Sequence, residues 1–269
     1  MSTVLLPCGA TLWFRKVGAG APLLQIHGSA FGHRNFERIS PLMQRQFEVI
    51  DFDLPGYGES RGGPALKDFS TLADTVAEFI EILGYSRVHV HGTSFGAMTA
   101  LALAARHPKL VDRLILSCFL ARYDEAARMM RATWKRAACE SGMDAVADLT
   151  SVAGFARSFY ERQDAQTQLA SMRDAFSRTT PAAFVAGTQM IERTDLSAFV
   201  PNVQAPVLLL AGDEDNMTPF KPAPSGVGFA QIQPLLKLSE LRVLQQCGHY
   251  LVIEQPEIAA AMIAEFLNR

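Results

Sequence analysis

The chain has 269 residues, 49% of them hydrophobic, and a formal net charge of −2 at pH 7. These values predict one globular domain, or a core with an inserted subdomain, rather than a disordered chain. The near-neutral charge, and the lack of an apolar run of ~18–20 residues, give no indication of nucleic acid or a membrane as a partner.

The N-terminal sequence lacks the basic start and long apolar stretch of a signal peptide, so a cytoplasmic location is expected. The four cysteines are scattered, with no pair and no His/Cys cluster at metal-ligand spacing: Cys8, Cys118, Cys139 and Cys247. We therefore expect free thiols and no metal.

Segments typical of strands and of helices alternate along the first 118 residues. The rough alternation of apolar and polar residues at 10–18 predicts an antiparallel edge strand or hairpin arm. The helix expected at 70–84 has a candidate N-cap in Ser70 and a candidate C′ residue in Gly84. Other strands are expected at 21–28, at the start of 47–60, at 87–92 and at 111–118, and other helices at 34–46 and 95–108. This alternation predicts an α/β fold with a parallel sheet covered by helices.

The pattern changes after residue 118. Residues 119–199 contain helical stretches, and strand signals return at 205–219 and 241–250 before a closing helix at 256–269. We predict a core made of residues 1–118 and 200–269, with 119–199 as a helical cap. The cap is expected over the carboxyl ends of the strands, where open α/β sheets bind ligands.

A serine stands between a predicted strand and a predicted helix, in Gly92-Thr93-Ser94-Phe95-Gly96. A serine in such a tight turn exposes its hydroxyl, and flanking glycines permit the crowded backbone that the turn requires. The N-terminus of the following helix favours negative charge at the same place. Ser94 is therefore a candidate nucleophile.

A serine hydroxyl needs a base, and the base needs a third group to orient it. Of the six histidines, His249 is favoured because it lies at a strand end before the last helix. Three acids directly follow a buried strand: Asp213, Glu214 and Asp215. The order serine, acid, histidine is that of the hydrolases whose nucleophile lies in a strand–turn–helix.

An oxyanion hole in this architecture uses the amide after the nucleophile and an amide from the loop after an earlier strand. The first donor would be Phe95. The second would be Ser29, with Ala30 as the alternative, because His27-Gly28 ends a predicted strand.

Five segments together resemble the α/β-hydrolase fold superfamily over nearly the whole chain. They are HGSAFG at 27–32, DFDLPGYGES at 51–60, GTSFG at 92–96, GDEDNMTP at 212–219 and GHYLVIEQPE at 248–257. In that family the acid follows the pattern G-x-x-D-x-x-x-P, which selects Asp215 and implies a Ser94–His249–Asp215 triad. In some members the acid instead follows the strand before the cap, and there Asp124 is the alternative.

Two subfamilies share further features. The segment 173–219 resembles 3-oxoadipate enol-lactonases and related hydrolases of small esters. The segments 27–36 and 248–250 are similar to C–C bond hydrolases of aromatic degradation, with Asn35 and Tyr250 in matching places, although Ala30 and Phe31 depart from the usual Gly-Pro. Haloalkane dehalogenases and epoxide hydrolases are excluded, because they have an aspartate where this chain has Ser94.

The predicted function is a serine hydrolase that cleaves a small ester or lactone through an acyl-enzyme. The alternatives are a C–C bond hydrolase, a lyase or a cofactor-free oxygenase of the same fold, or a binding protein that keeps the triad. No cofactor is expected. The partner is a small molecule with an apolar portion, and the chain is a monomer or homodimer. Its Pro- and Gly-rich segment 220–237 is a mobile loop near Asp215 or a subunit contact. The candidate pocket residues are His27, Ala30, Phe31, His33, Asn35, Trp134 and Tyr250.

Overall fold

A mostly parallel sheet forms the centre of the molecule in the computed structural model, which describes residues 2–62 and 67–269; residues 1 and 63–66 of the predicted core lie outside the described residues. Its strand order is β1-β2-β4-β3-β6-β7-β8-β9, with β5 paired to β2. The strands from β4 to β9 along this order are parallel, and β1 and β2 are antiparallel to their neighbours. The strands are β1 Ser2–Leu5, β2 Ala10–Val17, β3 Ala21–Ile26, β4 Phe47–Phe52, β5 Arg61–Gly62, β6 Val88–Thr93, β7 Val111–Ser117, β8 Val207–Gly212 and β9 Ser239–Leu244.

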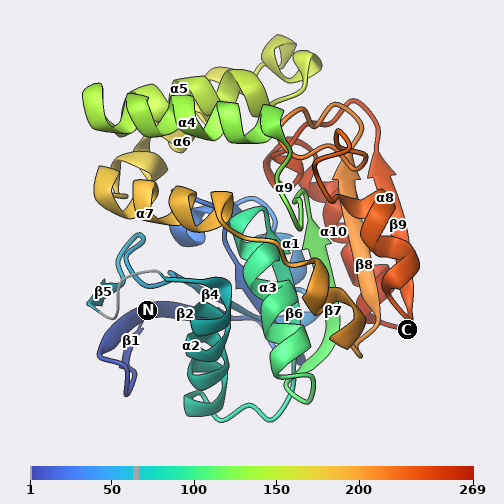
Figure 1. The fold of residues 1–269 in the computed structure, drawn as a ribbon. Helices are drawn as coiled ribbons and strands as arrows, with labels where there is room; N and C mark the ends of the chain where they lie inside the picture. The colour runs from blue at the N-terminus through green and yellow to red at the C-terminus, as the bar shows by residue number, and fades with distance from the viewer. Residues whose placement is uncertain (1, 63–66) are drawn as a thin grey trace.

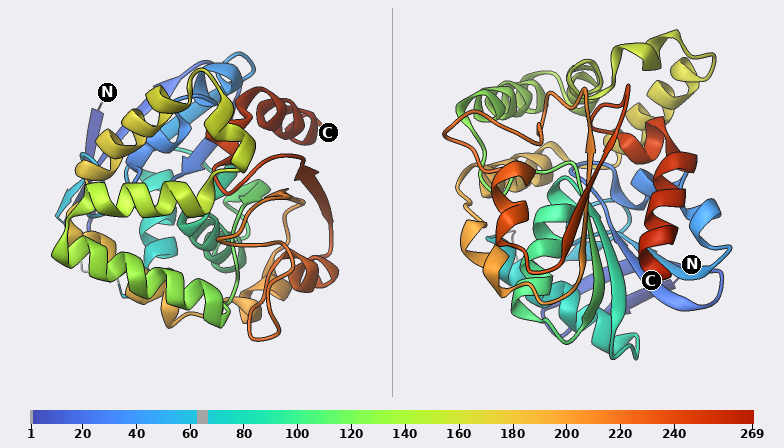
Figure 2. Two further views of the ribbon diagram at one scale, coloured as in Figure 1. Left: turned by 90° about the horizontal axis from the view of Figure 1, so that it is seen from above. Right: turned by 90° about the vertical axis from the view of Figure 1, so that its right-hand side faces the viewer.

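Helices cover both faces of the sheet (Figures 1 and 2). Helices α2 (Phe69–Ile82) and α3 (Phe95–Arg106) pack together on one face, and α1 (Ser40–Met43) and α10 (Pro256–Leu267) lie on the other. Helix α3 consists mainly of small and apolar residues, so it lies close against β6 and β7. The short helices α8 (Phe229–Ile232) and α9 (Leu251–Glu254) belong to the C-terminal part.

Four helices lie between β7 and β8 in the sequence and extend over one end of the sheet (Figure 1). They are α4 (Glu125–Glu140), α5 (Met143–Gly154), α6 (Ala165–Ser177) and α7 (Pro181–Glu192). We call residues 119–199, which include these helices, the insertion. Seen from above in Figure 2, the helices of the insertion lie over the sheet end at which β3, β6 and β8 finish.

Two expectations about local structure need correction. The helix expected at 34–46 is instead a 3₁₀ turn, Gly32–Phe36, followed by the short α1. Helix α2 begins at Phe69, because Asp68 rather than Ser70 is its N-cap and accepts a hydrogen bond from the Thr71 amide at 2.7 Å. The antiparallel strand expected at 10–18 is β2, which pairs with the edge strand β1 and matches the predicted hairpin arm.

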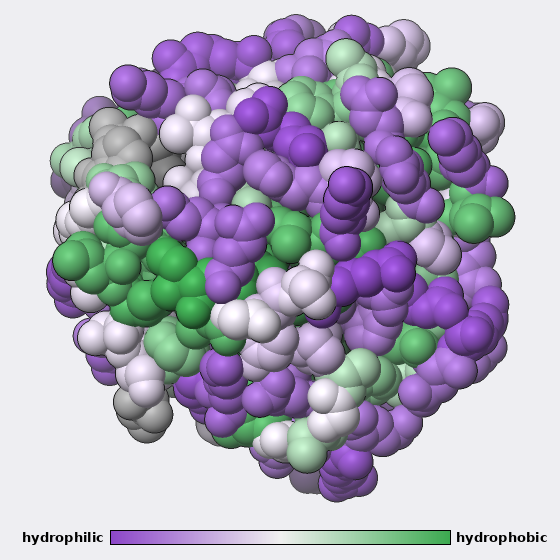
Figure 3. Space-filling view, turned by 90° about the horizontal axis from the view of Figure 1, so that it is seen from below, coloured by the Kyte–Doolittle hydropathy of each residue, from purple (hydrophilic) through white to green (hydrophobic). Residues whose placement is uncertain are grey.

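The face opposite the insertion is shown in Figure 3. Hydrophilic side chains there surround a band of hydrophobic ones. Within residues 2–62 and 67–269, no helix combines the length and apolar character needed to cross a bilayer.

Candidate active site

Ser94 occupies the turn between β6 and α3 with a backbone conformation that few residues other than glycine adopt. Its φ and ψ are 53° and −114°, and its amide donates to the Ser117 carbonyl of β7 at 2.9 Å. A Cβ atom at Gly96 would overlap the Ile26 carbonyl oxygen, and one at Gly92 would overlap the Gly96 carbonyl oxygen. The glycines are therefore needed for close approach of the backbones, and the turn keeps Ser94 in a strained conformation.

His249 and Asp215 form a buried pair beside this turn. The distance between His249 Nδ1 and Asp215 Oδ2 is 3.0 Å. Asp215 also accepts hydrogen bonds from the Met217 and Thr218 amides at 2.9 Å and from the Thr218 hydroxyl at 2.7 Å. Burial acts to raise the pKa of Asp215, but His249 and these hydrogen bonds outweigh it and lower the pKa below its usual value. Asp215 is therefore an anion that orients the imidazole. It contacts Nδ1 of His249, so Nε2 takes no part in the pair.

Ser94 and His249 line one narrow cavity under the insertion. The space between its lining atoms, with its mouth, is about 470 Å³. Most of the other lining residues are aromatic or apolar. The insertion supplies five residues of the lining: Arg131, Trp134, Thr150, Phe176 and Phe184. The cavity therefore brings residues that follow β6, β8 and β9 together with residues from α4 to α7.

Two backbone amides near Ser94 are available to a ligand. Within the described residues neither the Phe95 amide nor the Ser29 amide has a hydrogen-bond partner, whereas the Gly28 amide donates to Asn35 Oδ1 at 2.7 Å. Ser29 lines the cavity and Ala30 does not. This arrangement favours Ser29 over Ala30 as the second predicted oxyanion donor.

The sequence model of the α/β hydrolase fold matches residues 21–256. The chain belongs to this family. It is an enzyme of the α/β-hydrolase class, and the predicted fold is confirmed.

Relatives of this α/β-hydrolase carry several activities in their names. It is 28% identical over 270 residues to the AB hydrolase superfamily protein YisY of Bacillus subtilis, covering 96% of both chains. It is 26% identical to a 2-hydroxy-6-oxononadienedioate/2-hydroxy-6-oxononatrienedioate hydrolase of Pseudomonas putida, with 96% of this chain and 91% of that protein covered. A solved enol-lactonase from Burkholderia xenovorans LB400 superposes with a TM-score of 0.88 at 22% identity and full coverage of both chains, which shows the shared fold.

Four of the seven predicted pocket residues of this hydrolase line the cavity: Phe31, Asn35, Trp134 and Tyr250. Asn35 holds the loop in place, because its Oδ1 accepts from the Gly28 amide and from the Thr93 hydroxyl at 2.7 Å. Its amide nitrogen makes no hydrogen bond to the described residues, so it remains available to a ligand.

The other three, His27, Ala30 and His33, lie outside the cavity lining. Both ring nitrogens of His27 are used: Nε2 accepts from the Leu54 amide at 3.0 Å, and Nδ1 donates to the Gly28 carbonyl at 2.8 Å. Ala30 has a positive φ of 70°, at which the loop changes direction, and His33 beyond it does not reach the cavity that Ser94 lines.

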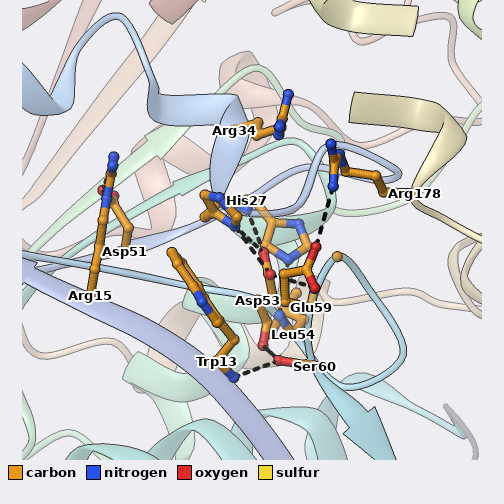
Figure 4. A network of polar contacts seen from close by, with 12 residues as sticks. Trp13, Arg15, His27, Arg34, Asp51, Asp53, Leu54, Glu59, Ser60 and Arg178 are labelled. Carbon is orange, nitrogen blue, oxygen red and sulfur yellow. Dashed lines mark hydrogen bonds and ion pairs between the residues drawn. The ribbon is translucent and has the colours of Figure 1, made fainter. Parts of the chain in front are cut away.

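His33 instead contacts Asp53. Asp53 belongs to the network of polar contacts drawn in Figure 4. Its Nδ1 lies 3.0 Å from Asp53 Oδ1, and its ring stacks on Trp13 with 3.9 Å between centroids. Asp53 also accepts from the Glu59 amide at 2.8 Å. The network ties two loops together, and His33 does not line the cavity, so its contact with substrate stays a prediction.

Asp124, the alternative acid, caps a helix. Its Oδ1 accepts from the Ala127 amide at 2.9 Å and its Oδ2 from the Ala223 amide at 3.0 Å. Both of its oxygens are engaged in this way, whereas Asp215 Oδ2 lies 3.0 Å from His249 Nδ1. The geometry therefore favours Asp215 as the acid.

Sequence reasoning missed Arg131 and Thr218. Arg131 is on the buried face of α4, three residues before Trp134, where helical spacing would normally place an apolar side chain. Thr218 Oγ1 lies 3.0 Å from His249 Nδ1 and donates to Asp215, so it connects the two. The signal for Arg131 was a single arginine within the apolar stripe of a predicted helix.

One group of possible metal ligands occurs among the described residues. Cys118 Sγ, an Asp215 carboxylate oxygen and a His249 nitrogen lie within 4.8 Å of one another. Burial raises the pKa of the Cys118 thiol well above its usual value, so the thiolate that binds metals is disfavoured. Asp215 and His249 are already hydrogen-bonded to each other, which suits proton transfer better than a metal site.

Proposed function

We propose that the protein is a serine hydrolase that cleaves a small ester or lactone through an acyl-enzyme. The observation that carries this proposal is the shared cavity of Ser94, held in its strained turn, and the His249–Asp215 pair. We also propose that residues 119–199 act as a cap over a core made of 1–118 and 200–269.

In the first half of the reaction, Ser94 Oγ attacks the carbonyl carbon of the substrate while His249 Nε2 takes its proton. Asp215 stabilises the imidazolium that forms, and the Phe95 and Ser29 amides donate to the oxyanion. The tetrahedral intermediate then collapses, the bond to the alcohol oxygen breaks, and His249 protonates that oxygen. A water molecule, deprotonated by His249, cleaves the acyl-enzyme and restores Ser94.

Arg131 is the basis for a proposal about the charge of the substrate. Its side chain is buried, lines the cavity and forms no ion pair with any described residue. Its guanidinium donates to the Tyr123 hydroxyl at 3.1 Å and lies 4.9 Å from the centroid of Trp134.

A buried arginine cannot lose its proton, and an unpaired buried charge is costly. Two carboxylates of the same helices have other partners, because Glu125 of α4 pairs with Arg128 and Glu192 of α7 with Lys135. A substrate carboxylate would supply the missing partner. We therefore propose an ester or lactone whose acyl part carries an anionic group.

The nucleophile is tested by intact mass after reaction with a small fluorophosphonate. The wild type is expected to gain one adduct, Ser94→Ala none, and Ser177→Ala, on the exposed surface of α6, one. Turnover of Ser94→Ala is expected to fall by about 10⁴–10⁶-fold. A folded Ser94→Ala protein that keeps a tenth of wild-type turnover would refute the assignment.

The second candidate function is C–C bond hydrolysis. Asn35 and Tyr250, which match positions of the C–C bond hydrolases, both line the cavity, and a relative named for this activity is 26% identical. Steady-state rates on carboxylate-bearing esters, lactones and aromatic ring-cleavage products separate the two. Faster turnover of the ring-cleavage products by the same Ser94-dependent site would favour the second candidate.

A further inference from the structure

Glu254, at the C-terminal end of α9, has a buried carboxylate that joins two distant segments. Its Oε1 and Oε2 accept from the Gly248 amide at 3.0 and 3.1 Å, and Oε2 also accepts from the Ala156 amide at 3.0 Å. Gly248 immediately precedes His249, and Ala156 belongs to the insertion. One side chain therefore bridges the loop of the proposed base and the segment after α5.

A second contact fixes the same loop to the insertion. The His249 amide donates to the Gly154 carbonyl, the last residue of α5, at 2.6 Å. The Tyr250 hydroxyl donates to the Thr150 carbonyl at 3.4 Å. A Cβ at Gly248 would overlap the Gly154 carbonyl oxygen, so the two backbones are in close contact.

We propose that Glu254 is a positioning residue that makes the placement of the His249 imidazole depend on the position of the insertion. When residues 154–156 are docked, the carboxylate holds Gly248 and the imidazole is aligned with Asp215 and Ser94. When this contact is lost, His249 keeps its hydrogen bond to Asp215, but the loop that carries His249 is no longer fixed to the insertion. This inference rests on the proposed role of His249 as the base.

The physical basis is the sensitivity of proton transfer to geometry. A displacement of about 1 Å at a reacting group costs up to about 10²-fold in rate. Trp134 and Phe176 line the cavity on the insertion side and take no part in the bridge. A weakened bridge should therefore lower kcat and leave KM nearly unchanged.

The bridge can be cut from either end. Glu254→Gln replaces one carboxylate oxygen by an NH₂ group that cannot accept from an amide. Ala156→Pro removes the amide that donates to Glu254. Ala156 has a φ of −63° and Phe155 has ψ of 145°, so proline and its preceding residue fit the existing backbone.

Matched controls leave the bridge intact. Glu257→Gln makes the same chemical change at an exposed position of α10, and Ala156→Gly keeps the amide. Circular dichroism and thermal unfolding establish that each variant is folded. If Glu254→Gln does not fold, Ala156→Pro carries the test alone, because it leaves the carboxylate and its bonds to Gly248 in place.

The readouts are kcat and KM on an ester, and the low-field proton NMR resonance of the His249 Nδ1–H bonded to Asp215. Both bridge variants are expected to lower kcat by about 10–100-fold, to keep KM within about twofold, and to shift or broaden that resonance. The controls should match the wild type.

The proposal is overturned if a folded bridge variant keeps the kcat and the resonance of its control. The NMR comparison needs no turnover, so it also tests the bridge if the proposed function fails. That failure would be recognised separately, by a wild-type protein whose Ser94 does not react with the fluorophosphonate.

Discussion

The core side and the insertion side of the cavity are built differently. On the core side, Asp215 accepts three hydrogen bonds from Met217 and Thr218, and Ser94 is held by glycine contacts and by β7. On the insertion side, aromatic rings face the cavity and the one cation among the lining residues, Arg131, has no anionic partner in the described chain. The hydrogen bonds that hold Asp215 and Ser94 come from the chain itself and leave the Phe95 and Ser29 amides for a ligand, whereas the insertion presents a buried charge that a ligand would neutralise.

This contrast assigns different tasks to the two sides. Fixed hydrogen-bond partners suit groups that must be aligned before the reaction begins. Apolar walls with one charged group suit recognition of a ligand whose shape and charge supply the remaining contacts. Changes on the core side should therefore reduce the rate with every substrate, and changes on the insertion side should alter the choice among substrates.

The largest expected effect is that of Asp215→Asn. An amide in place of the carboxylate no longer stabilises the imidazolium or selects the Nδ1–H tautomer, so kcat should fall by about 10⁴-fold with all esters. Steady-state kinetics on a neutral and an anionic ester measure it. Asp124→Asn is the matched control, because asparagine caps a helix about as well as aspartate and kcat should stay within about twofold. A larger loss in Asp124→Asn than in Asp215→Asn would reverse the assignment of the acid.

Arg131→Met tests the insertion side, and should remove the preference for an anionic over a neutral ester. Hydrogen bonds to charged groups contribute about 1.5–3 kcal/mol, so kcat/KM for an ester with a carboxylate on its acyl part should fall by about 10–150-fold. The rate with a neutral ester of similar size should change little. Because the variant replaces an unpaired buried charge by an apolar side chain, we expect its free energy of unfolding to rise by about 1 kcal/mol, measured by urea titration.

Equal losses with the anionic and the neutral ester would mean that Arg131 only supports Trp134. Arg131→Lys helps to interpret that outcome. It keeps the charge but lacks the planar fork, and should recover part of the preference for the anionic ester without restoring the stacking on Trp134.

The same contrast explains what the sequence could predict. Ser94, Asp215 and His249 follow strands, and parallel strands bring their carboxyl ends to one edge, so chain order and glycine spacing predicted Ser94, His249 and one of three acids there. The resemblance to the α/β hydrolases then selected Asp215. The sequence did not show that His33 lies outside the cavity lining, because its nearness to Ser29 does not reveal the positive φ values of Ala30 and Gly32, 70° and 59°.

Residues of the insertion were harder to predict for another reason. Which face of α4 meets the cavity depends on how α4 packs against α5 and α7, and no local motif encodes that packing. Trp134 was among the predicted pocket residues, whereas Arg131 was not. The bridge of Glu254 joins segments 98 residues apart, and only the folded chain brings them together.

The last prediction concerns stability rather than rate, and it follows from the burial of Glu254. Burial raises the pKa of Glu254 from its usual value of 4.5 to about 7, although the amides that donate to it act to lower it. Asp215 adds to the rise in pKa. Other titratable or charged groups lie on the segments packed around it: Arg38, Tyr160, Arg162 and Cys247.

Between pH 4.5 and 7 the folded chain therefore holds a proton on Glu254 that the unfolded chain has lost. Stability from this group is full below pH 4.5 and declines as the pH rises to about 7, by about 1.4 kcal/mol for each pH unit. Glu254→Gln does not titrate, so its free energy of unfolding relative to the wild type should rise across this range and then level off. Urea unfolding of both proteins at pH 5, 6, 7 and 8 measures the difference. A difference that is constant with pH would show that the carboxylate is ionised throughout, and that the amides of Gly248 and Ala156 outweigh burial.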